Sequence, residues 1–333
     1  MKICITGGAG MIGSRLTKRL LAEGHSIQII DNLWRGKLEN IANLSGFNME
    51  HDFFNIDLSN PENQTQVVSI LSNADAVIHL ADIVAGIGYV FNNQYEIFRI
   101  NNLINTNLFN ACAKAEVKKI IYAGTACSFP KDLQMSLDSE LKETQLYPAE
   151  PESAYGWSKL MGSLELQFMQ ERYGMQTTTL MLHNVYGPNC DIDPKTSQVI
   201  PSIIRKIVEL PEGGTLDVWG SGNQGRAFMH VDEICNAFVA ALNKENLPPI
   251  IQIGPNQCTS IKELVQILVN KIANKKIEIH YDLTKPEGDK GRFADYSLAK
   301  EVLGWEPSVS LEDGLRETYQ WVSDLVKKQA VAE

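Results

Sequence analysis

Short apolar runs alternate with longer amphipathic stretches along the first 182 residues of the chain. The run 76–80 is almost continuously apolar, as in parallel strands that are covered on both faces. Because strands and helices alternate, the pattern predicts an α/β fold with a doubly wound, Rossmann-type parallel sheet. Strands are expected at 2–6, 26–30, 49–54, 76–80, 119–123 and 177–182, and helices at 14–23, 67–72, 93–115 and 153–173.

Beyond residue 182 the alternation loosens, which predicts a smaller C-terminal α/β domain. The expected division is 1–182 and 183–333, with the segment around 227–250 packing back on the first domain. In this second part, helices are expected at 199–210, 231–243, 260–273, 297–303 and 310–328, and strands at 216–219, 250–253 and 277–281.

A glycine turn joins the first expected strand to the first helix. Its glycines, Gly7, Gly10 and Gly13, permit a tight turn, the approach of a pyrophosphate and close helix–strand packing. Asp31 closes the second strand, where a carboxylate would accept hydrogen bonds from an adenosine ribose. The pattern therefore predicts a dinucleotide site that takes NAD, because the carboxylate would repel the 2′-phosphate of NADP. Arg35 is expected at the rim of this site.

Composition and charge narrow the possible partners. The net charge of −10 on 333 residues argues against nucleic acid or an anionic membrane as the main partner. No apolar run is long enough to span a bilayer, and the N-terminus enters a strand pattern directly, so no signal peptide is expected. The six cysteines are scattered without a C-x-x-C pair, which predicts no metal site and favours a reducing, cytoplasmic location.

Tyr155 and Lys159 are the first candidates for chemistry. Four residues apart on a helix, they share one face, and a lysine beside a phenol lowers the phenol pKa. The pair suits proton transfer at an alcohol, although the spacing alone also fits an ordinary surface pair. Thr125 follows the strand 119–123, at the sheet edge where ligands of such folds bind.

Together these features resemble the extended short-chain dehydrogenase/reductase family, whose members epimerise, dehydrate or reduce nucleotide sugars. The resemblance covers essentially the whole chain. It implies that residues 1–182 bind NAD, that residues 183–333 bind a nucleotide sugar, and that a homodimer forms through a four-helix bundle of the helices 93–115 and 153–173. Further matching motifs are Asn102 with Thr106, Asn184-Val-Tyr-Gly-Pro188, Trp219-Gly-Ser-Gly222 with Arg226, Arg292-x-x-Asp295, and Leu303-Gly-Trp305.

Within this family, the stretch after Thr125 separates subgroups. Dehydratases usually carry an Asp-Glu pair where this chain has Ala126 and Cys127, which argues against a 4,6-dehydratase. The run Cys127-Ser-Phe-Pro130 looks most like GDP-mannose 3,5-epimerases and GDP-fucose synthases, which use this cysteine as an acid/base beside a C4 ketone. The segments 148–151, 183–188 and 285–292 lean toward the 3,5-epimerases.

Two departures from those enzymes bear on the reaction. Gln198 occupies the place of the Lys or His that serves as their second acid, and an amide cannot exchange a proton as those groups do. Lys195 is the other candidate in this segment. Asp31 argues against an NADPH-dependent reductase such as GDP-fucose synthase, and for NAD that is reduced and reoxidised within one turnover.

The resemblance implies a role for each matching residue. The expected catalytic residues are Thr125, Cys127, Tyr155 and Lys159. The expected cofactor contacts are Gly7, Gly10, Met11, Ile12, Gly13, Asp31, Asn32, Asp57, Leu58, Leu80, Ala81, Asn102, Tyr155 and Lys159. The expected substrate contacts are Gly86, Asn184, Val199, Trp219, Arg226 and Arg292, of which the two arginines would grip the diphosphate.

The expected reaction begins with oxidation at C4 of the sugar. Tyr155 would take the hydroxyl proton, with its pKa lowered by Lys159, and Thr125 would hold the C4 oxygen. The ketone acidifies the C–H bonds at C3 and C5, from which Cys127 could remove a proton. A C4 epimerase in which Cys127 only shapes the pocket, a C4 dehydrogenase or reductase, and an NAD-sensing regulator remain as alternatives.

Overall fold

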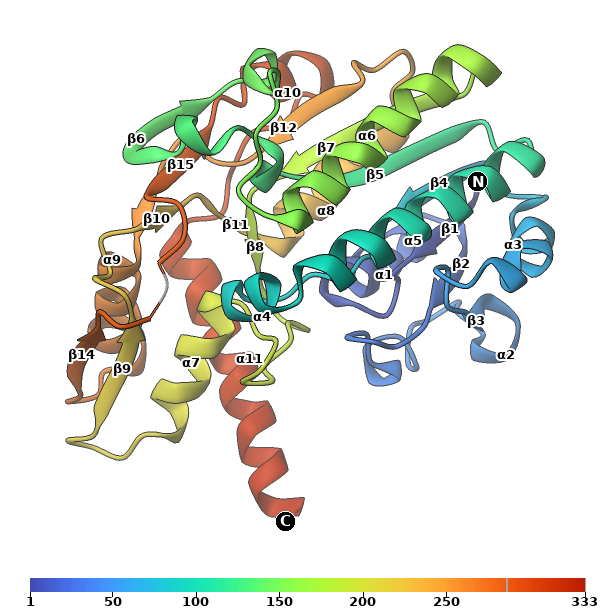
Figure 1. The fold of residues 1–333 in the computed structure, drawn as a ribbon. Coiled ribbons are helices and arrows are strands. Elements are labelled where there is room, and N and C mark those ends of the chain that lie inside the picture. Colours follow the sequence, from blue (N-terminus) through green and yellow to red (C-terminus); the bar gives the residue numbers. More distant parts are fainter. Residues whose placement is uncertain (286, 333) are drawn as a thin grey trace.

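The computed structural model describes residues 1–285 and 287–332. Its centre is a parallel sheet with the strand order β12-β7-β5-β4-β1-β2-β3 (Figure 1). This arrangement confirms the predicted Rossmann-type α/β fold. The strands are β1 (Lys2–Thr6), β2 (Ser26–Asp31), β3 (Phe53–Asn55), β4 (Ala76–His79), β5 (Lys119–Thr125), β7 (Gln176–Leu182) and β12 (Ile250–Ile253).

Helices cover both faces of this sheet, which is why β1, β4 and β5 consist mostly of apolar residues. Ile3 and Ile5 of β1 pack in a core that includes Leu16 and Phe238, whereas Cys4 belongs to the core on the opposite face. The first face carries α1 (Met11–Ala22) and α8 (Val231–Leu242), and the second carries α3 (Gln64–Leu71), α5 (Gln94–Lys114) and α6 (Ala154–Tyr173).

The strand expected at 49–54 is only partly correct. Residues Met49–Asp52 form the short helix α2, because Asn48 caps it by accepting a hydrogen bond from the Glu50 amide at 2.9 Å. The strand β3 begins at Phe53 and pairs with β2. The short helix α4 occupies Ile87–Asn92, a segment for which the sequence pattern predicts no helix.

The rest of the chain builds a smaller part with short strands beside the sheet. Among the described residues it contains four two-stranded sheets, two of which join segments far apart in sequence: β6 pairs with β15, and β9 pairs with β14. Its strands are β6 (Met135–Leu141), β8 (Asn184–Tyr186), β9 (Thr215–Trp219), β10 (Gly225–Arg226), β11 (Phe228–His230), β13 (Thr259–Ser260), β14 (Glu278–Asp282) and β15 (Gly291–Ala294).

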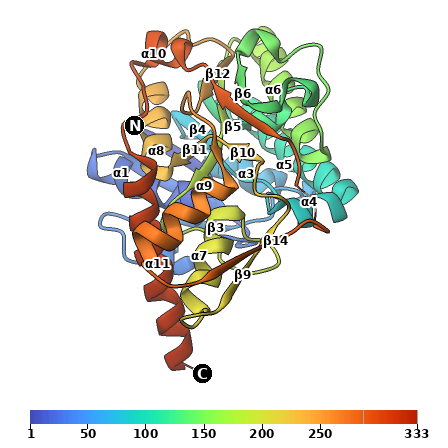
Figure 2. The ribbon, with the colours of Figure 1, turned by 90° about the vertical axis from the view of Figure 1, so that its left-hand side faces the viewer.

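The last long helix ties this smaller part together. Leu315 and Val322 of α11 are buried in one core with Ile204 of α7 and Leu268 (Figure 2). The helix expected at 260–273 is α9 followed by a π-helical segment, Ile267–Ala273. The remaining helices are α7 (Val199–Glu209), α9 (Ile261–Gln266), α10 (Ser297–Leu303) and α11 (Leu311–Ala332).

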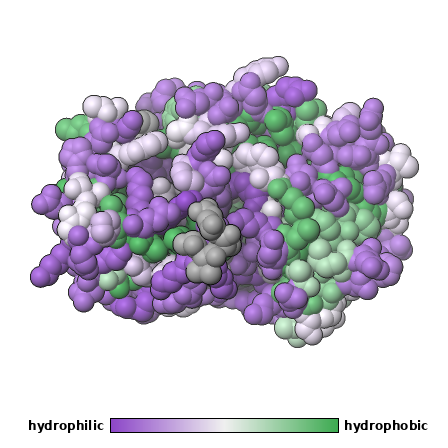
Figure 3. Space-filling model, turned by 90° about the horizontal axis from the view of Figure 1, so that it is seen from below, coloured by the Kyte–Doolittle hydropathy of each residue, from purple (hydrophilic) through white to green (hydrophobic). Residues whose placement is uncertain are grey.

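The chain crosses between the two parts more than once. After the smaller strands begin, it returns to the large sheet: α8 lies beside α1, and β12 adds an edge strand next to β7. Among the described helices, none combines enough length with enough apolar character to cross a bilayer. The face seen from below is largely hydrophilic, with a hydrophobic area to its right (Figure 3).

Candidate active site

A cavity of about 730 Å³ lies at the carboxyl ends of the central strands and reaches α7 and β9 of the smaller part. Its walls include all the residues expected to act on or bind a ligand, with one exception, Asn102. The lining therefore brings together Gly7, Gly10, Met11, Ile12, Gly13, Asp31, Asn32, Asp57, Leu58, Leu80, Ala81, Gly86, Thr125, Cys127, Tyr155, Lys159, Asn184, Val199, Trp219, Arg226 and Arg292.

The glycine turn has no room for side chains. Gly7 has a φ of +70°, and a Cβ there would lie 2.9 Å from the Ala81 nitrogen. A Cβ on Gly13 would collide with the Gly7 carbonyl oxygen, so the helix could not pack against the turn. Gly10 caps α1 without a side chain, which leaves the first amides of the helix open to an anion such as a pyrophosphate.

The backbone fixes the Asp31 carboxylate in an orientation that allows a second contact with a ligand in the same site. Its carboxylate accepts hydrogen bonds from the amides of Ala9 at 2.9 Å and Leu33 at 2.8 Å, and burial raises its pKa. Two backbone donors fix the carboxylate but leave lone pairs that can accept ribose hydroxyls. The turn and this acid together fit NAD.

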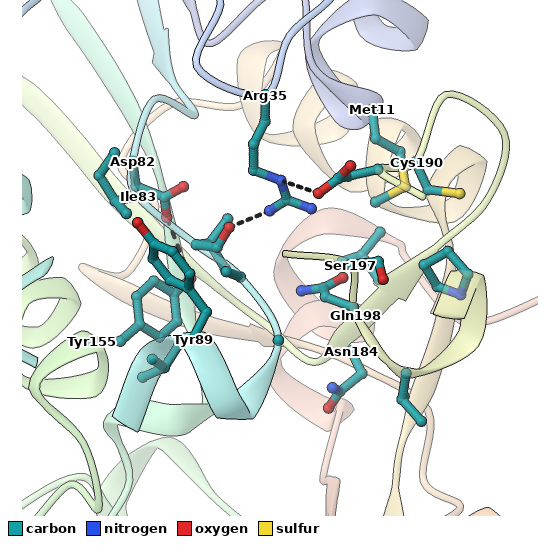
Figure 4. Close-up of a pocket in the computed structure, with 18 of the residues that line it drawn as sticks. Met11, Arg35, Asp82, Ile83, Tyr89, Tyr155, Asn184, Cys190, Ser197 and Gln198 are labelled. Atoms are coloured by element: carbon teal, nitrogen blue, oxygen red, sulfur yellow. Dashed lines mark hydrogen bonds and ion pairs between the residues drawn. The ribbon is translucent and has the colours of Figure 1, made fainter. Parts of the chain in front are cut away.

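Arg35 lies inside the cavity rather than at its rim. Its guanidinium donates to the Val84 carbonyl, and Nε lies 3.3 Å from an oxygen of Asp191 (Figure 4). Asp191 belongs to the loop between β8 and α7. The side chain of Arg35 therefore spans the cavity from the cofactor side to the smaller part of the molecule.

Tyr155 and Lys159 both contact a third side chain, that of Asp82. The Lys159 ammonium lies 2.9 Å from Asp82 Oδ2. The Tyr155 hydroxyl donates to the same oxygen at 3.3 Å, and both residues are labelled in Figure 4. Lys159 is almost completely buried and also lies 4.5 Å from the centre of the Tyr122 ring. The helix spacing thus places both residues on one face, and Asp82 joins them.

The expected lowering of the Tyr155 pKa by Lys159 is not found. Burial, followed by the charge of Asp82, raises the pKa of Tyr155 well above its ordinary value. The reason is that the lysine charge is paired with Asp82. Sequence reasoning passed over this acid as part of a cofactor-lining loop, although its place three residues after the end of β4 is typical of functional groups.

Cys127 is positioned by two elements. Thr125 ends β5, and its hydroxyl accepts a hydrogen bond from the Cys127 amide at 3.2 Å. Gly156, in the first turn of α6, packs so closely on the Cys127 backbone that a Cβ would lie 2.9 Å from the Cys127 carbonyl carbon. The cysteine is therefore fixed beside the turn that carries Tyr155.

Arg292 makes contacts that differ from the expected diphosphate clamp. Its Nη2 donates to Cys127 Sγ at 3.2 Å, and its Nη1 donates to Asp289 at 2.6 Å and to Gln134. The side chain is almost fully buried. Burial lowers the pKa of Arg292, but Cys127 and Asp289 outweigh this effect and raise it. The guanidinium therefore holds the Cys127 sulfur on the cavity wall.

Arg226 and Trp219 line the part of the cavity nearest β9. Arg226 donates to the backbone carbonyls of Gly225 at 2.6 Å and Asp289 at 2.7 Å. Trp219 is 43% exposed, and its ring lies against Gly88. A partly exposed indole and a cation at one end of the cavity suit a nucleotide base and a phosphate. Pro286, within the expected motif at 285–292, lies outside the described residues.

Asn102 does not point into the site. Its amide donates to the Phe98 carbonyl on the outer face of α5. The neighbouring Asn101 is buried instead, and its side chain accepts from the Ile83 amide at 2.6 Å and donates to the Ile83 carbonyl at 3.2 Å. The helical period could have identified it, because Asn101 falls in register with the buried residues Ile97 and Ile104.

The segment in which a second acid was expected also lines the cavity. Gln198 precedes α7 and lines the cavity (Figure 4), and Lys195 lines it as an exposed residue. Two carboxylates that sequence reasoning did not single out, Glu152 and Asp289, lie on the same lining. The charge of Asp289 is one of the causes that raise the pKa of Glu152, although 137 positions separate the two residues in the sequence.

Comparisons with known proteins agree with this geometry. Residues 3–254 match the model of the NAD dependent epimerase/dehydratase family. The chain is 31% identical to GDP-mannose 3,5-epimerase 1 of Oryza sativa subsp. indica, over 99% of this chain and 83% of that one. It is 30% identical to GDP-L-fucose synthase of Escherichia coli (strain K12), over 96% of each chain.

The solved structures of similar fold include C4 epimerases. UDP-glucose 4-epimerase of Thermotoga maritima with UDP-glucose has a TM-score of 0.85 and 28% identity, covering 98% of this chain and all of that one. UDP-glucuronic acid 4-epimerase of Bacillus cereus, in complex with UDP-glucuronic acid and NAD, has a TM-score of 0.82 and 28% identity over the same shares.

Proposed function

The chain belongs to the NAD-dependent epimerase/dehydratase family, and on that premise we propose that it epimerises a GDP-linked sugar at C3 and C5 through transient oxidation at C4. It is an NAD-dependent enzyme of this family. The observation that carries the finer proposal is the contact of Arg292 with Cys127 Sγ at 3.2 Å, beside Thr125 and Tyr155. A pure C4 epimerisation does not require a thiol in contact with a buried guanidinium.

NAD supplies a hydride acceptor and donor when it is bound. We assign its pyrophosphate to the glycine turn and its adenosine ribose to Asp31, with residues 1–182 as the cofactor-binding part. Residues 183–333 then contribute the nucleotide-sugar site, in which Trp219 and Arg226 hold the nucleotide. Asn184 and Val199 line the space between these two regions.

Tyr155 takes the proton of the C4 hydroxyl in this proposal. Its phenol already donates to Asp82, so the phenol proton can move to that carboxylate as the sugar proton arrives. Lys159 neutralises Asp82 and keeps it in place. Thr125 holds the C4 oxygen, since its hydroxyl lies at the end of β5 on the cavity wall.

The C4 ketone then acidifies the neighbouring C–H bonds. Cys127, whose Sγ is held by Arg292, removes a proton from C3 or C5, and the electron pair is held as an enolate on the C4 oxygen. Return of a proton to the other face inverts the carbon. Reduction of the ketone then completes the turnover without net consumption of the cofactor.

A C4 epimerase of a UDP-sugar is the second candidate. It is favoured by the fold similarity to the UDP-glucose and UDP-glucuronic acid 4-epimerases. In that reaction Cys127 would only shape the pocket. A C4 dehydrogenase or reductase would instead release oxidised or reduced product, and an NAD-sensing regulator would function without Tyr155.

Solvent deuterium separates these reactions. The purified protein is first screened with GDP-, UDP-, CDP- and dTDP-sugars for the largest rise in melting temperature. GDP-mannose is then incubated with the holoenzyme in D₂O, and the sugar is analysed by NMR. We expect deuterium at C3 and C5. Inversion at C4 without deuterium would support the C4 epimerase, and net accumulation of reduced or oxidised nucleotide would support the dehydrogenase. Normal cellular function of Tyr155→Phe would support the regulator.

We further propose that two chains pair through α5 and α6, in a reducing, cytoplasmic setting. These helices lie side by side (Figure 1), and their accessible surfaces carry large apolar side chains, including Tyr95 at 73% exposure and Phe168 at 58%. Exposed aromatic side chains on two adjacent helices are typical of an interface. All six cysteines are free thiols, which is the state that a reducing compartment maintains.

A further inference from the structure

A buried row of hydrogen-bonded side chains lies behind the cavity and ends at the catalytic lysine. Its members are Thr6 at the end of β1, His79 at the end of β4, Asn105 of α5 and Tyr122 of β5. All four are almost completely inaccessible, and none of them lines the cavity. The ring of Tyr122 lies against Lys159, so the row reaches a residue on which the oxidation of the sugar depends.

The backbone sets the direction of these hydrogen bonds. The amides of Leu80 and Ala81 both donate to Thr6 Oγ1 at 3.3 Å, so the Thr6 hydroxyl proton is directed to His79 Nδ1 at 2.7 Å. Burial lowers the pKa of His79 to about 3, which keeps the imidazole neutral. A neutral imidazole that accepts at Nδ1 carries its proton on Nε2. His79 Nε2 therefore donates to Asn105 Oδ1 at 3.0 Å.

Asn105 continues the same direction and fixes the Tyr122 ring. Because its Oδ1 accepts from His79, its Nδ2 is free to donate to the Tyr122 hydroxyl oxygen at 3.2 Å. The Tyr122 ring also stacks on the imidazole, with centroids 5.2 Å apart and an interplanar angle of 26°. Gly162 of α6 leaves room for the phenol, since a Cβ there would lie 2.8 Å from the hydroxyl oxygen. The ring is thus held at its hydroxyl and at its face.

The fixed ring in turn restricts the Lys159 ammonium. Nζ lies 4.5 Å from the ring centre, close enough for a cation to be attracted by the aromatic face. The other contact of the ammonium is Asp82 Oδ2 at 2.9 Å, the oxygen to which the Tyr155 hydroxyl also donates. Because the lysine side chain is almost fully buried, protein contacts rather than bulk water determine where its charge lies.

We propose that Tyr122 is a positioning residue, which holds the Lys159 ammonium beside Asp82 and Tyr155 for the oxidation at C4. This inference rests on the function proposed above. The positive charge of Lys159 favours the phenolate of Tyr155, the form that accepts the proton of the sugar hydroxyl. Without the ring, the long lysine side chain gains freedom, and its charge lies on average farther from Tyr155.

The test compares Tyr122→Leu and Tyr122→Phe with the control Phe109→Leu. Phe109 belongs to the same core and packs edge-on against the Tyr122 ring, with centroids 5.9 Å apart. In the described part of the chain it makes no cation–π contact with Lys159. Each holoenzyme is mixed with GDP-mannose, and reduction of the bound nucleotide is followed by its absorbance across a range of pH. Melting temperatures show that the variants fold, and Tyr122→Met replaces Tyr122→Leu if the latter does not.

Tyr122→Leu should reduce its nucleotide about 10-fold more slowly at neutral pH. Its pH profile should move to higher pH, because Tyr155 then ionises less readily. Tyr122→Phe retains the aromatic face and should restore most of the rate. Phe109→Leu should lower the melting temperature but leave the profile unchanged.

A second measurement follows the lysine itself, with or without substrate. In NMR spectra of protein with isotopically labelled lysine, the Lys159 signal is identified by its loss in Lys159→Met. The Tyr122 ring should shift this signal in the wild type and in Phe109→Leu, and the shift should vanish in Tyr122→Leu. An unchanged Lys159 signal in Tyr122→Leu would overturn the inference, and so would a wild-type pH profile. If the wild type itself reduces no nucleotide with GDP-mannose, the oxidation at C4 fails, and the role of Tyr122 fails with it.

Discussion

Asp82 is the residue on which the redox centre depends. In the described part of the chain it is the only ion-pair partner of Lys159, and both side chains are nearly inaccessible, at 10% and 2% exposure. Removing one member of a buried pair leaves an uncompensated charge. Asp82→Asn should therefore lower the free energy of unfolding by about 3–5 kcal/mol.

Thermal and urea unfolding would measure this loss for Asp82→Asn. The exposed Asp138 offers a control, because Asp138→Asn changes the same charge without a buried partner. Equal stability of the two variants would show that the ion pair between Lys159 and Asp82 does not contribute to the free energy of unfolding. The substitution should also lower the pKa of Tyr155, since the second-largest cause of its elevation is removed.

The raised pKa of Glu152 leads to a second prediction, on how the stability of the fold depends on pH. Its folded pKa of about 7 lies above the ordinary value of 4.5, so the folded state binds more protons than the unfolded state between these values. Stability contributed by this group is present at low pH and decreases as pH rises from 4.5 to 7. The groups that face it are Asp289, Arg226 and Arg292. Between pH 4.5 and 7, the melting temperature should fall less steeply with pH for Glu152→Gln than for the wild type. Parallel curves for the two proteins would contradict the raised pKa of Glu152.

At the scale of helices, the proposed dimer depends on the exposed surface of α5 and α6. Phe168 is 58% exposed, and a carboxylate in its place would be buried against the partner if the proposed bundle forms. Phe168→Asp should therefore shift the protein from dimer to monomer in sedimentation or size-exclusion measurements. Leu283→Asp is the control, because Leu283 is 73% exposed but lies outside these helices. A stable dimer in both variants would exclude this interface.

Local patterns predicted the large sheet well and the pairing of remote segments poorly. The strands of the sheet are apolar on both faces, so 76–80 and 119–123 could be recognised without knowledge of their neighbours. By contrast, β6 is mostly polar and becomes a strand only because β15 pairs with it. The capping of α2 by Asn48 also explains why the strand expected at 49–54 begins late.

The same distinction applies to the site. Motifs identified the glycine turn, Thr125, Cys127, Tyr155 and Lys159, all of which line one cavity. The ion pair of Lys159 with Asp82 and the cluster of Glu152 with Asp289 arise from tertiary packing, so no spacing along the chain could reveal them. Register within α5 was a smaller error, because Asn101 and Asn102 differ by one position but lie on different faces.

The two parts of the molecule meet across the cavity through Arg35. It extends from the cofactor side to Asp191, in the loop before α7, and that loop is braced by a 2.5 Å hydrogen bond from Thr196 to Asp191. Both partners of the ion pair are largely buried, at 21% and 12% exposure. The bridge should therefore restrain separation of the two walls, and with it the exchange of a bound dinucleotide.

Breaking this bridge should accelerate cofactor exchange. Arg35→Ala and Asp191→Asn should each raise the release rate of bound NAD by roughly 10-fold, which corresponds to about 1.4 kcal/mol. The double variant should exceed neither single variant, because both substitutions remove the same contact. Exchange of bound NAD for a fluorescent analogue measures the rate in all four proteins. Additive effects would mean that Arg35 and Asp191 act on the cofactor separately, whereas non-additive effects would mean that the ion pair itself holds the cavity closed around it.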